Sequence, residues 1–435
     1  MDKTVFEKRR RDLMQQMGGG LALIPTAPVR NRNRDVNFPF RPDSDFYYLT
    51  HFPEPEACAV LVPGRAHGEF ILFCRERNPE KEIWDGRRAG LDGARELYGA
   101  DDAFPIDDID DILPGLLENR EKVFCSMGRH PEFDAKLMEW VNEVRAKSRN
   151  GVSAPGEFVD LNHLLHEMRL FKRPEELRLM KRAAKVSAQA HRRAMQTCRP
   201  GLMEYELEAE LLYEFKKGGS QSPAYPPIVG GGANSCILHY TENNTELKAG
   251  DMLLIDAGAE IDGYAADITR SFPVSGKFSA EQRAVYEVVL AAQLAAIEQV
   301  KSGKHWNEPH EAAVRILVDG LMQLKLLNGS PDQLLETGAY KRFYMHRTGH
   351  WLGLDVHDVG DYKLHDTWRL LEPGMVLTVE PGLYISAGDP TIPKGFWDIG
   401  VRIEDDVLVT RDDPEVLSRD APKTIDDIEA LMAKT

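Results

Sequence analysis

The stretch MLLIDAGAEIDGYAADITRSF, residues 252–272, is the most informative segment of the chain. Two apolar runs flank EIDG (260–263), which can form a hairpin turn with glycine available where a positive φ is needed. If the turn is centred in the middle of these four residues, Asp256 and Asp267 stand directly opposite each other. Their Cβ atoms would then be about 5 Å apart.

The two carboxylates of this hairpin would repel each other. At about 4 Å the repulsion is roughly 4 kcal/mol at an effective dielectric constant near 20. Exposure to water, protonation of one acid or a bound cation would each relieve it. Because apolar runs surround both acids, a solvated face is the weaker explanation, and we interpret Asp256 and Asp267 as ligands of a metal ion.

Two further acids lie in strand-like segments. Glu380 closes the run MVLTVE and is followed by Pro-Gly, so the strand is expected to stop there. Glu404 lies inside GVRIEDDVLVT (400–410), which has the pattern of one strand with three consecutive acids. Either acid alone is typical of an ordinary strand end or edge, and the prediction rests on their occurrence together with histidines.

Histidines are concentrated in the segment MHRTGHWLGLDVHDVG, which holds His346, His350 and His357 among glycines and is expected to be a loop. His239, in CILHYTEN, lies near the expected end of a strand. Four carboxylates with one imidazole form an oxygen-rich ligand set, which favours Mn²⁺, Fe²⁺ or Mg²⁺, with Zn²⁺ and Co²⁺ as alternatives. Two divalent cations would neutralise four carboxylates, whereas one would not.

The bulk composition narrows the class of protein. A chain of 435 residues exceeds the size of a single core, so two domains are expected. The net charge of −16 argues against nucleic acid as a partner, because phosphate binding needs a basic surface. The N-terminus lacks the apolar region of a secretory signal, and no apolar run reaches a membrane-spanning length. The five scattered cysteines form no C-x-x-C pair, which fits a reducing compartment and hence the cytoplasm.

The segment FKRPEE (171–176) marks the expected domain boundary. Before it, short strand and helix patterns alternate, which predicts a small α/β domain over residues 1–171. After it, long amphipathic helices and several strands form the second domain, residues 172–435. Pro174 suits the first position of a long helix that opens this domain.

The candidate ligands follow one another along the chain in this order: Asp256, Asp267, His350, Glu380 and Glu404. With their flanking runs DAGAEIDGYAADITRSF, GHWLGLDVHD, TVEPG and VRIEDD, they resemble the ligand set of the pita-bread metallopeptidases. This family includes aminopeptidase P, prolidase and methionine aminopeptidase. The similarity covers about residues 172–415, and FPFRPDSDFYYLTHFPEPEA (38–57) resembles the N-terminal domain of aminopeptidase P.

The resemblance implies an α/β N-terminal domain followed by an α+β pita-bread catalytic domain. It implies the activity of a bacterial Xaa-Pro aminopeptidase, which releases the N-terminal residue of peptides with proline at position two. Two divalent ions, typically Mn²⁺, would be bridged by Asp267 and Glu404 and would activate a bridging hydroxide. Glu380 would help to move its proton, and the protein would be a homodimer or homotetramer.

Other matching residues receive roles only through this resemblance. His239, His346 and His357 would line the substrate site, and His239 and His357 would stabilise the tetrahedral intermediate or orient the substrate. Arg402 would support the ligand carboxylates.

Two residues of the N-terminal domain and one departure complete the comparison. Trp84 and Asp35 resemble residues that approach the active site, Trp84 from a neighbouring subunit. Arg347 stands where many relatives have glycine, which leaves the geometry of the histidine loop and nearby substrate contacts open.

Four alternatives remain within or beyond this family. A prolidase would cut only Xaa-Pro dipeptides. Methionine aminopeptidase is disfavoured by the N-terminal domain of about 170 residues, and a metal-free creatinase-like hydrolase is disfavoured because all five ligand positions are filled. A non-catalytic binding protein of the same fold is disfavoured for the same reason.

Overall fold

The computed structural model describes residues 1–433, which divide into two compact units. The first unit is Met1–Met168, and the second begins at Arg169, three residues before the expected start of the second domain. No helix in the described part of the chain is long and apolar enough to cross a membrane.

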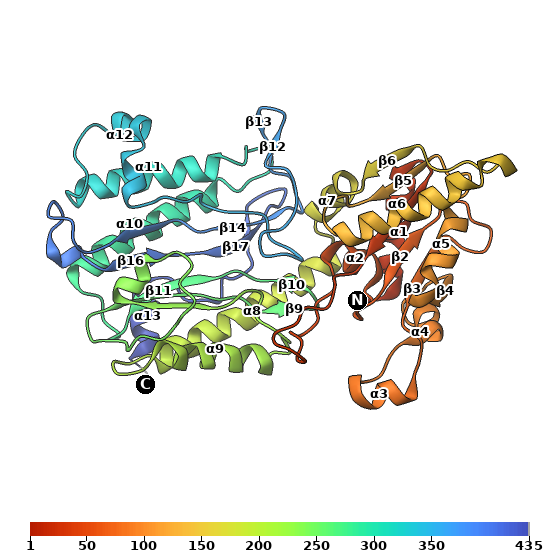
Figure 1. Ribbon diagram of the computed structural model, residues 1–435. Coiled ribbons are helices and arrows are strands. Elements are labelled where there is room, and N and C mark those ends of the chain that lie inside the picture. Colours follow the sequence, from red (N-terminus) through yellow and green to blue (C-terminus); the bar gives the residue numbers. More distant parts are fainter. Residues whose placement is uncertain (434–435) are drawn as a thin grey trace. The chain divides into compact units, whose positions relative to one another are not determined.

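The first unit is built on one six-stranded sheet with the order β4-β3-β2-β1-β5-β6 (Figure 1). Its strands are β1 (Leu21–Pro25), β2 (Cys58–Leu61), β3 (Phe70–Cys74), β4 (Asp102–Pro105), β5 (Lys122–Cys125) and β6 (Glu157–Asp160). β2 runs antiparallel to both β1 and β3, whereas β1, β5 and β6 are mutually parallel. Helices connect all of these strands except β2 and β3, which a short loop joins, and the unit is a small α/β domain as expected.

The helices of this unit are α1 (Lys3–Met17), α2 (Ser44–Thr50), α3 (Pro79–Asp85), α4 (Gly90–Glu96), α5 (Ile109–Leu117), α6 (Pro131–Ala146) and α7 (Asn162–Leu170). Most of them bury apolar residues, whereas α3 buries none of its residues. α5 and α6 bury Leu113, Leu137 and Val141 against Leu23 and Val60 of the sheet. α2 packs against β1 and β2, and α1 packs against α2.

The second unit combines long helices with several short sheets. Its helices are α8 (Pro174–Thr197), α9 (Glu204–Lys217), α10 (Ala280–Glu298), α11 (Glu308–Gln323), α12 (Pro331–Thr337) and α13 (Ile425–Met432). Its longer strands are β7 (Ile228–Gly231), β8 (Met252–Asp256), β11 (Thr269–Pro273), β14 (Val376–Val379), β15 (Gly382–Ile385), β16 (Ile399–Arg402) and β17 (Asp405–Leu408). Its two-residue strands are β9 (Glu260–Ile261), β10 (Tyr264–Ala265), β12 (Lys363–Leu364), β13 (Thr367–Trp368) and β18 (Glu415–Val416).

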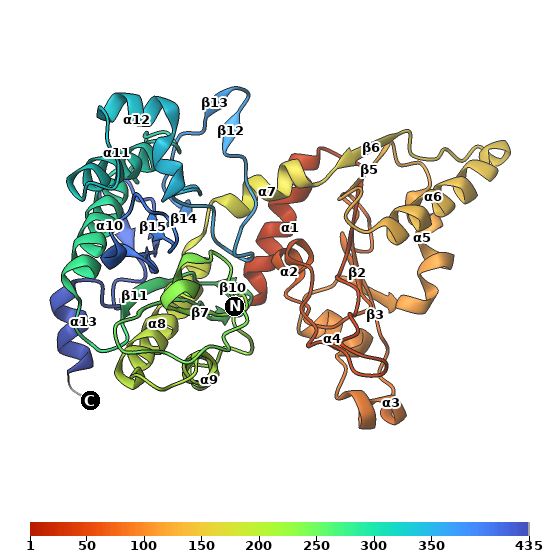
Figure 2. The ribbon, with the colours of Figure 1, turned by 60° about the vertical axis from the view of Figure 1, so that its left-hand side comes forward.

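The strands of the second unit lie between the helix pair α8–α9 and the helix pair α10–α11 (Figures 1 and 2). One apolar core joins both pairs to the sheets. α8 starts with Pro174 at its first position, and the Glu176 carboxylate accepts the backbone N–H of Arg173. This α+β arrangement agrees with the expected class of the second domain.

The hairpin at 252–272 forms, but its predicted register is wrong. Ile261 pairs with Tyr264, so the turn is centred one residue later, on Asp262 and Gly263, and each cross-strand partner shifts by two residues. Both of these residues have positive φ, 52° and 84°, as a two-residue type I′ turn requires. Consequently Asp256 faces Thr269 rather than Asp267.

The shift places Asp267 opposite a glycine. The backbone N–H of Ala257 donates to the carbonyl oxygen of Ile268, and the N–H of Ala266 donates to the carbonyl oxygen of Ala259. These two hydrogen bonds continue the same register, which sets Asp267 opposite Gly258. Asp256 and Asp267 are therefore diagonal neighbours on one face of the hairpin instead of a direct pair.

The expected single strand at 400–410 is in fact two strands. β16 pairs with β15, β17 pairs with β14, and the ladder is interrupted at residues 403–404. On the facing chain the interruption falls at residues 380–381. The register on either side, with Val379 opposite Asp405 and Gly382 opposite Arg402, brings Glu380 opposite Glu404. The direct pairing of like charges that we predicted for two aspartates thus occurs between two glutamates.

A second departure concerns His239. The predicted strand over IVGGGANSCILHY ends at Gly231, and residues 232–236 form a 3₁₀ turn. His239 consequently lies in an exposed turn after this segment rather than at a strand end.

Gly258 offers a test of the hairpin, because a Cβ atom there would lie 1.7 Å from the carbonyl oxygen of Ala266. We expect Gly258→Ala to lower the free energy of unfolding by about 2 kcal/mol or more, since the backbone itself must move. Thermal melting measures the effect. Gly115→Ala is the control, because a Cβ atom there meets nothing within 4 Å. Equal melting temperatures for the two variants would contradict the tight hairpin.

Candidate metal centre

Asp256 and Asp267 meet at one hydroxyl group. The Tyr225 hydroxyl lies 2.6 Å from Asp256 Oδ1 and 2.5 Å from Asp267 Oδ1. Both acids are buried, with 9% and 4% of their surface exposed. Although the register separates them by one diagonal step, their carboxylates converge on the same point.

His350 joins this group from the loop before β14. Its Nε2 atom lies 3.4 Å from Asp267 Oδ2 and 3.7 Å from Glu380 Oε1. Its Nδ1 atom lies 2.9 Å from the carbonyl oxygen of Trp351. A donor at Nδ1 leaves the Nε2 lone pair directed at the carboxylates, which is the tautomer that a metal ligand needs.

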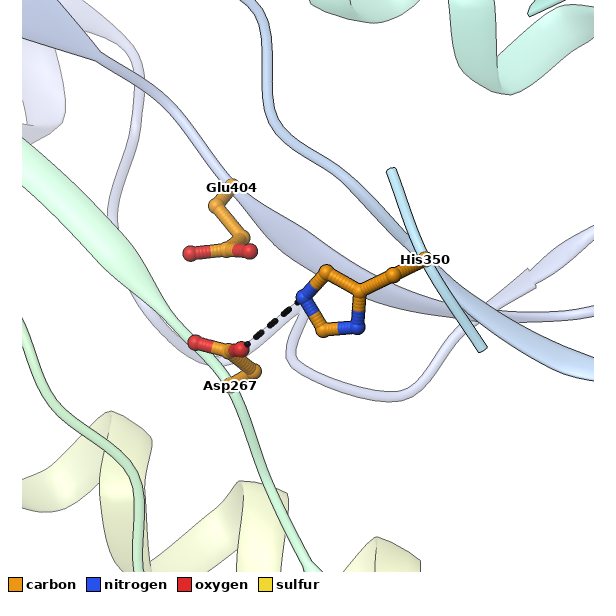
Figure 3. A group of neighbouring side chains, drawn as sticks. All are labelled: Asp267, His350 and Glu404. Atoms are coloured by element: carbon orange, nitrogen blue, oxygen red, sulfur yellow. Dashed lines mark ion pairs between the residues drawn. The ribbon is translucent and has the colours of Figure 1, made fainter. Parts of the chain in front are cut away.

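Asp267, His350 and Glu404 form the tightest cluster of potential ligands, shown in Figure 3. One ligand atom from each lies within 4.8 Å of the other two. The three side chains come from the hairpin, the histidine loop and the interrupted ladder, which are far apart in the sequence. Three separate elements therefore deliver nitrogen and oxygen donors to one point.

Threonines hold the two opposed glutamates. The Thr269 hydroxyl, facing Asp256 across the hairpin, donates to Glu404 Oε2 at 2.7 Å. Thr378 Oγ1 lies 3.4 Å from Glu380 Oε1 and accepts the backbone N–H of His350 at 3.1 Å. Glu404 is thus oriented from β11, whereas Glu380 is oriented by a residue of β14, the strand that it follows.

Arg402 is the buried cation of this site. Its Nη2 donates to Asp256 Oδ2 at 2.6 Å, its Nε to Thr269 Oγ1 at 3.1 Å and its Nη1 to the Tyr384 hydroxyl at 3.0 Å. Through Thr269 the same arginine also supports Glu404. Arg402 thus contacts Asp256 directly and Glu404 through Thr269, and its supporting role at a metal site stays a prediction.

The three consecutive acids after Arg402 have different surroundings. Glu404 faces the site, whereas Asp405 pairs with Arg270 and Lys423, each at 2.7 Å. The Asp406 carboxylate accepts the backbone N–H of Asp267 at 3.1 Å. The three acids therefore have three different roles. Glu404 is a candidate metal ligand, Asp405 forms ion pairs, and Asp406 supports the hairpin.

Excess negative charge characterises the centre. Burial raises the pKa of Glu404 well above its usual range, and the charges of Asp267 and Glu380 add to the effect. Burial also raises the pKa of Glu380 to about 7, against the opposing charges of His350 and Arg402. For Asp267, the hydrogen bond and charge of His350 outweigh burial and lower the pKa.

These residues fit divalent cations. Arg402 brings one permanent positive charge to four carboxylates, and buried carboxylates without compensating charge are costly. The donors are carboxylate oxygens and one imidazole nitrogen, a set suited to hard or borderline divalent ions. Asp256, Asp267, His350, Glu380 and Glu404 are accordingly the residues that could hold the metal.

The other predicted histidines lie around this centre. His346 Nε2 lies 2.8 Å from the Tyr384 hydroxyl, and burial lowers the pKa of His346 to about 3. His357 packs its ring edge-to-face on His350, with centroids 4.3 Å apart, and burial lowers its pKa. His239 lies in an exposed turn, and its part in the substrate site stays a prediction.

Arg347, the departure from the family pattern, turns away from the acids. It donates to Asn307 and lies over the ring of Trp368, 4.9 Å from the centroid. The backbone φ at this position is not positive, so glycine is not required. The arginine therefore ties the loop to the start of α11 and to β13.

Sequence reasoning missed Tyr225 and Tyr384. Tyr384 follows Glu380 by four residues on β15, and the strand pattern around Glu380 could have pointed to it. Tyr225 lies in the irregular segment before β7 and carries no comparable signal. In the first unit, Trp84 is 87% exposed on α3 and Asp35 is exposed, and their expected approach to an active site stays a prediction.

The shared hydroxyl of Tyr225 predicts a measurable effect on metal binding. Tyr225→Phe removes the group that orients Asp256 and Asp267, and we expect the affinity for Mn²⁺ to fall by about tenfold. Titration calorimetry on chelator-treated protein measures it. Tyr205→Phe, at a half-exposed position, is the control. Wild-type affinity in the Tyr225 variant would contradict the orienting role.

Comparisons with known proteins bear on this site and on the whole chain. The model of metallopeptidase family M24 matches residues 178–411, and that of the aminopeptidase P N-terminal domain matches residues 6–124. The Xaa-Pro aminopeptidase of Escherichia coli K12 is 46% identical over 434 residues, which is 99% of this chain and 98% of that protein. The Xaa-Pro aminopeptidase of Haemophilus influenzae is 44% identical over 433 residues, again 99% and 98% of the two chains.

Solved structures agree with these matches. Aminopeptidase PepP of Pseudomonas aeruginosa superposes with a TM-score of 0.99 at 59% identity, covering 100% of this chain and 98% of that one. Proline aminopeptidase P II of Yersinia pestis gives a TM-score of 0.97 at 46% identity, covering all of both chains. The expected two-domain pita-bread fold is confirmed, and the family together with the ligand cluster indicates binding of a divalent metal. The chain belongs to metallopeptidase family M24, in the aminopeptidase P branch.

Proposed function

We propose that the protein is an Xaa-Pro aminopeptidase that works with two divalent metal ions. The observation that carries this proposal is the buried group of four carboxylates and His350, in a chain that is 46% identical over its length to an Xaa-Pro aminopeptidase. Asp256, Asp267, His350, Glu380 and Glu404 would hold the ions, with Asp267 and Glu404 shared between them. Mn²⁺ is our first choice, followed by Zn²⁺, Co²⁺, Fe²⁺ and Mg²⁺.

The metals would supply Lewis acidity, which lowers the pKa of water and polarises the peptide carbonyl. The protein contributes the remaining groups. Glu380, whose Oε1 atom lies 3.7 Å from His350 Nε2 in the buried centre, would accept and return a proton during the reaction. The leaving nitrogen of an Xaa-Pro bond carries no hydrogen and must gain a proton to depart, so a carboxyl group of this kind is needed.

The histidines supply neutral hydrogen-bonding groups. His346 keeps a pKa of about 3 because it is buried, so it is uncharged at neutral pH and is anchored to Tyr384. His357 packs on the ring of His350, and both His357 and His239 are exposed to solvent. We assign them to orienting the substrate and stabilising the oxyanion that develops on its carbonyl group.

Selectivity for a free N-terminus comes to this proposal from the relatives, because two divalent ions would cancel the charge of the four acids. The preference for proline at position two comes to this proposal from the relatives, which are named Xaa-Pro aminopeptidases.

We further propose a homo-oligomer, a dimer or tetramer, located in the cytoplasm. All five cysteines are free, and three of them are buried, which fits a reducing environment. Peptides are the expected partners, and the acidic chain is not expected to bind nucleic acid.

The function is tested with three peptide classes, Xaa-Pro-Xaa, Xaa-Ala-Xaa and the dipeptide Xaa-Pro. We expect release of the first residue from Xaa-Pro-Xaa, loss of activity on chelation and recovery with Mn²⁺. Asp267→Ala should lose activity by at least about a thousandfold because it removes a shared ligand.

Each contrary outcome identifies a different alternative. Hydrolysis of the dipeptide alone would favour a prolidase. Full activity in metal-free protein would contradict the metal mechanism. If metal-loaded protein hydrolyses none of the peptides, the result would favour a non-catalytic binding protein of the same fold.

A further inference from the structure

The loop that carries His357 is folded around the carboxylate of Asp358. Asp358 is 5% exposed, and its Oδ1 and Oδ2 atoms accept bonds from two different cations. Arg169 Nη2 lies 2.5 Å from Oδ1, and Lys172 Nζ lies 2.8 Å from Oδ2. Less than 2% of each of these three side chains is exposed, so the cluster is out of reach of solvent.

The two cations come from the first residues of the second unit. Arg169 lies in the last turn of α7, where the second unit begins, and Lys172 precedes α8 by two residues. Arg169 also reaches Asp355 Oδ2 at 2.8 Å, on the same loop. The charges of Lys172 and Arg169 overcome burial and lower the pKa of Asp358, so its carboxyl group is ionised at neutral pH.

At Gly353 the backbone of the loop lies directly against the Asp358 carboxylate and the Lys172 side chain. A Cβ atom at this position would lie 2.2 Å from Asp358 Oδ2 and 2.9 Å from Lys172 Cε. Because glycine has no Cβ atom, the ion pair between Lys172 and Asp358 can pack directly against the backbone at this position. Its carbonyl oxygen accepts the backbone N–H of Ala265 at 2.8 Å, which attaches the loop to the carboxylate hairpin.

Asp358 also connects to the histidines through the backbone. Its N–H donates to the carbonyl oxygen of Trp351 at 2.9 Å. The same oxygen is the partner of His350 Nδ1, also at 2.9 Å. His357, the residue before Asp358, packs its ring on His350 with an angle of 73° between the planes. A change in the Asp358 clamp therefore reaches both rings. His357 is itself exposed, and within residues 1–433 no hydrogen bond holds its ring.

We propose that Asp358, clamped by Arg169 and Lys172, is a positioning residue that holds His357 against His350 at the candidate metal centre. The segment at the start of the second unit thereby sets the position of a substrate-facing histidine. The kinetic part of this inference rests on the proposed peptidase function, whereas the geometric part does not.

A double-mutant cycle separates positioning from general stability. We compare wild type, Asp358→Asn, His357→Ala and the double variant on one Xaa-Pro-Xaa peptide, with metal content measured for each. We expect Asp358→Asn to lower kcat/KM by about 10- to 100-fold through displacement of His357, with metal content unchanged. In the His357→Ala background the same change should cost less than about twofold, because the histidine that it positions is gone.

Controls keep each outcome decisive. Asp361→Asn, an exposed acid three residues away, should behave as wild type. If Asp358→Asn does not fold, Lys172→Met replaces it in the cycle, because the ion pair between Arg169 and Asp358 is then kept. Lys172→Arg restores the positive charge and should restore the wild-type rate. Losses that multiply in the double variant, or an Asp358 variant with the wild-type rate, would overturn the proposal.

A crystal structure of the Asp358 or Lys172 variant gives a readout that does not depend on activity. The ring centroids of His350 and His357, now 4.3 Å apart, should separate by about 1 Å or more. Unchanged ring positions would overturn the inference even if the enzyme is active. Absence of peptidase activity in the wild type would instead count against the proposed function and leave this geometric test in force.

Discussion

Buried negative charge at an interruption of a strand ladder is the constraint on which the second unit depends. Glu380 and Glu404 face each other where β14 gives way to β15 and β16 gives way to β17. Asp267 adds a third carboxylate within reach of Glu404 and His350. A continuous ladder would not tolerate opposed acids in its interior, because their repulsion in a dry environment exceeds what pairing returns.

The surrounding polar groups are arranged to orient these acids more than to neutralise them. The Tyr225 hydroxyl lies between Asp256 and Asp267, and the Thr269 hydroxyl donates to Glu404. Arg402 donates to both Asp256 and Thr269, and so links Asp256 to Glu404. Only Arg402 among these brings charge. A divalent metal site requires carboxylates that are already oriented and whose negative charge the metal ion can neutralise. The arrangement around Arg402 meets this requirement.

Much of this site could be predicted from the sequence, because its acids lie in apolar segments where charge is unusual. Asp256 and Asp267 in a hairpin, and three histidines in a glycine-rich loop, were sufficient to predict a metal. The register was wrong because apolar alternation does not distinguish a turn centred on Asp262-Gly263 from one centred a residue earlier. The break at Glu404 was missed because GVRIEDDVLVT has the same pattern as one unbroken strand.

Other features could not be predicted because they depend on tertiary contacts. Tyr225 reaches the aspartates from an irregular segment, and Asp358 meets Arg169 and Lys172 across more than 180 positions of sequence. The contacts of Arg347 with Asn307 and Trp368 are likewise tertiary and leave no local pattern in the sequence. Local pattern identifies which residues are unusual, whereas only the folded chain identifies their partners.

The most direct test of this account is the metal content of the protein. Protein stripped with a chelator, reloaded with Mn²⁺ and freed of excess ion should contain two equivalents per chain by elemental analysis. Two ions would match four carboxylates, and anomalous scattering from crystals should locate both beside Asp267 and Glu404. A single equivalent, or two ions located elsewhere, would contradict the claim that this buried charge is a dinuclear metal site.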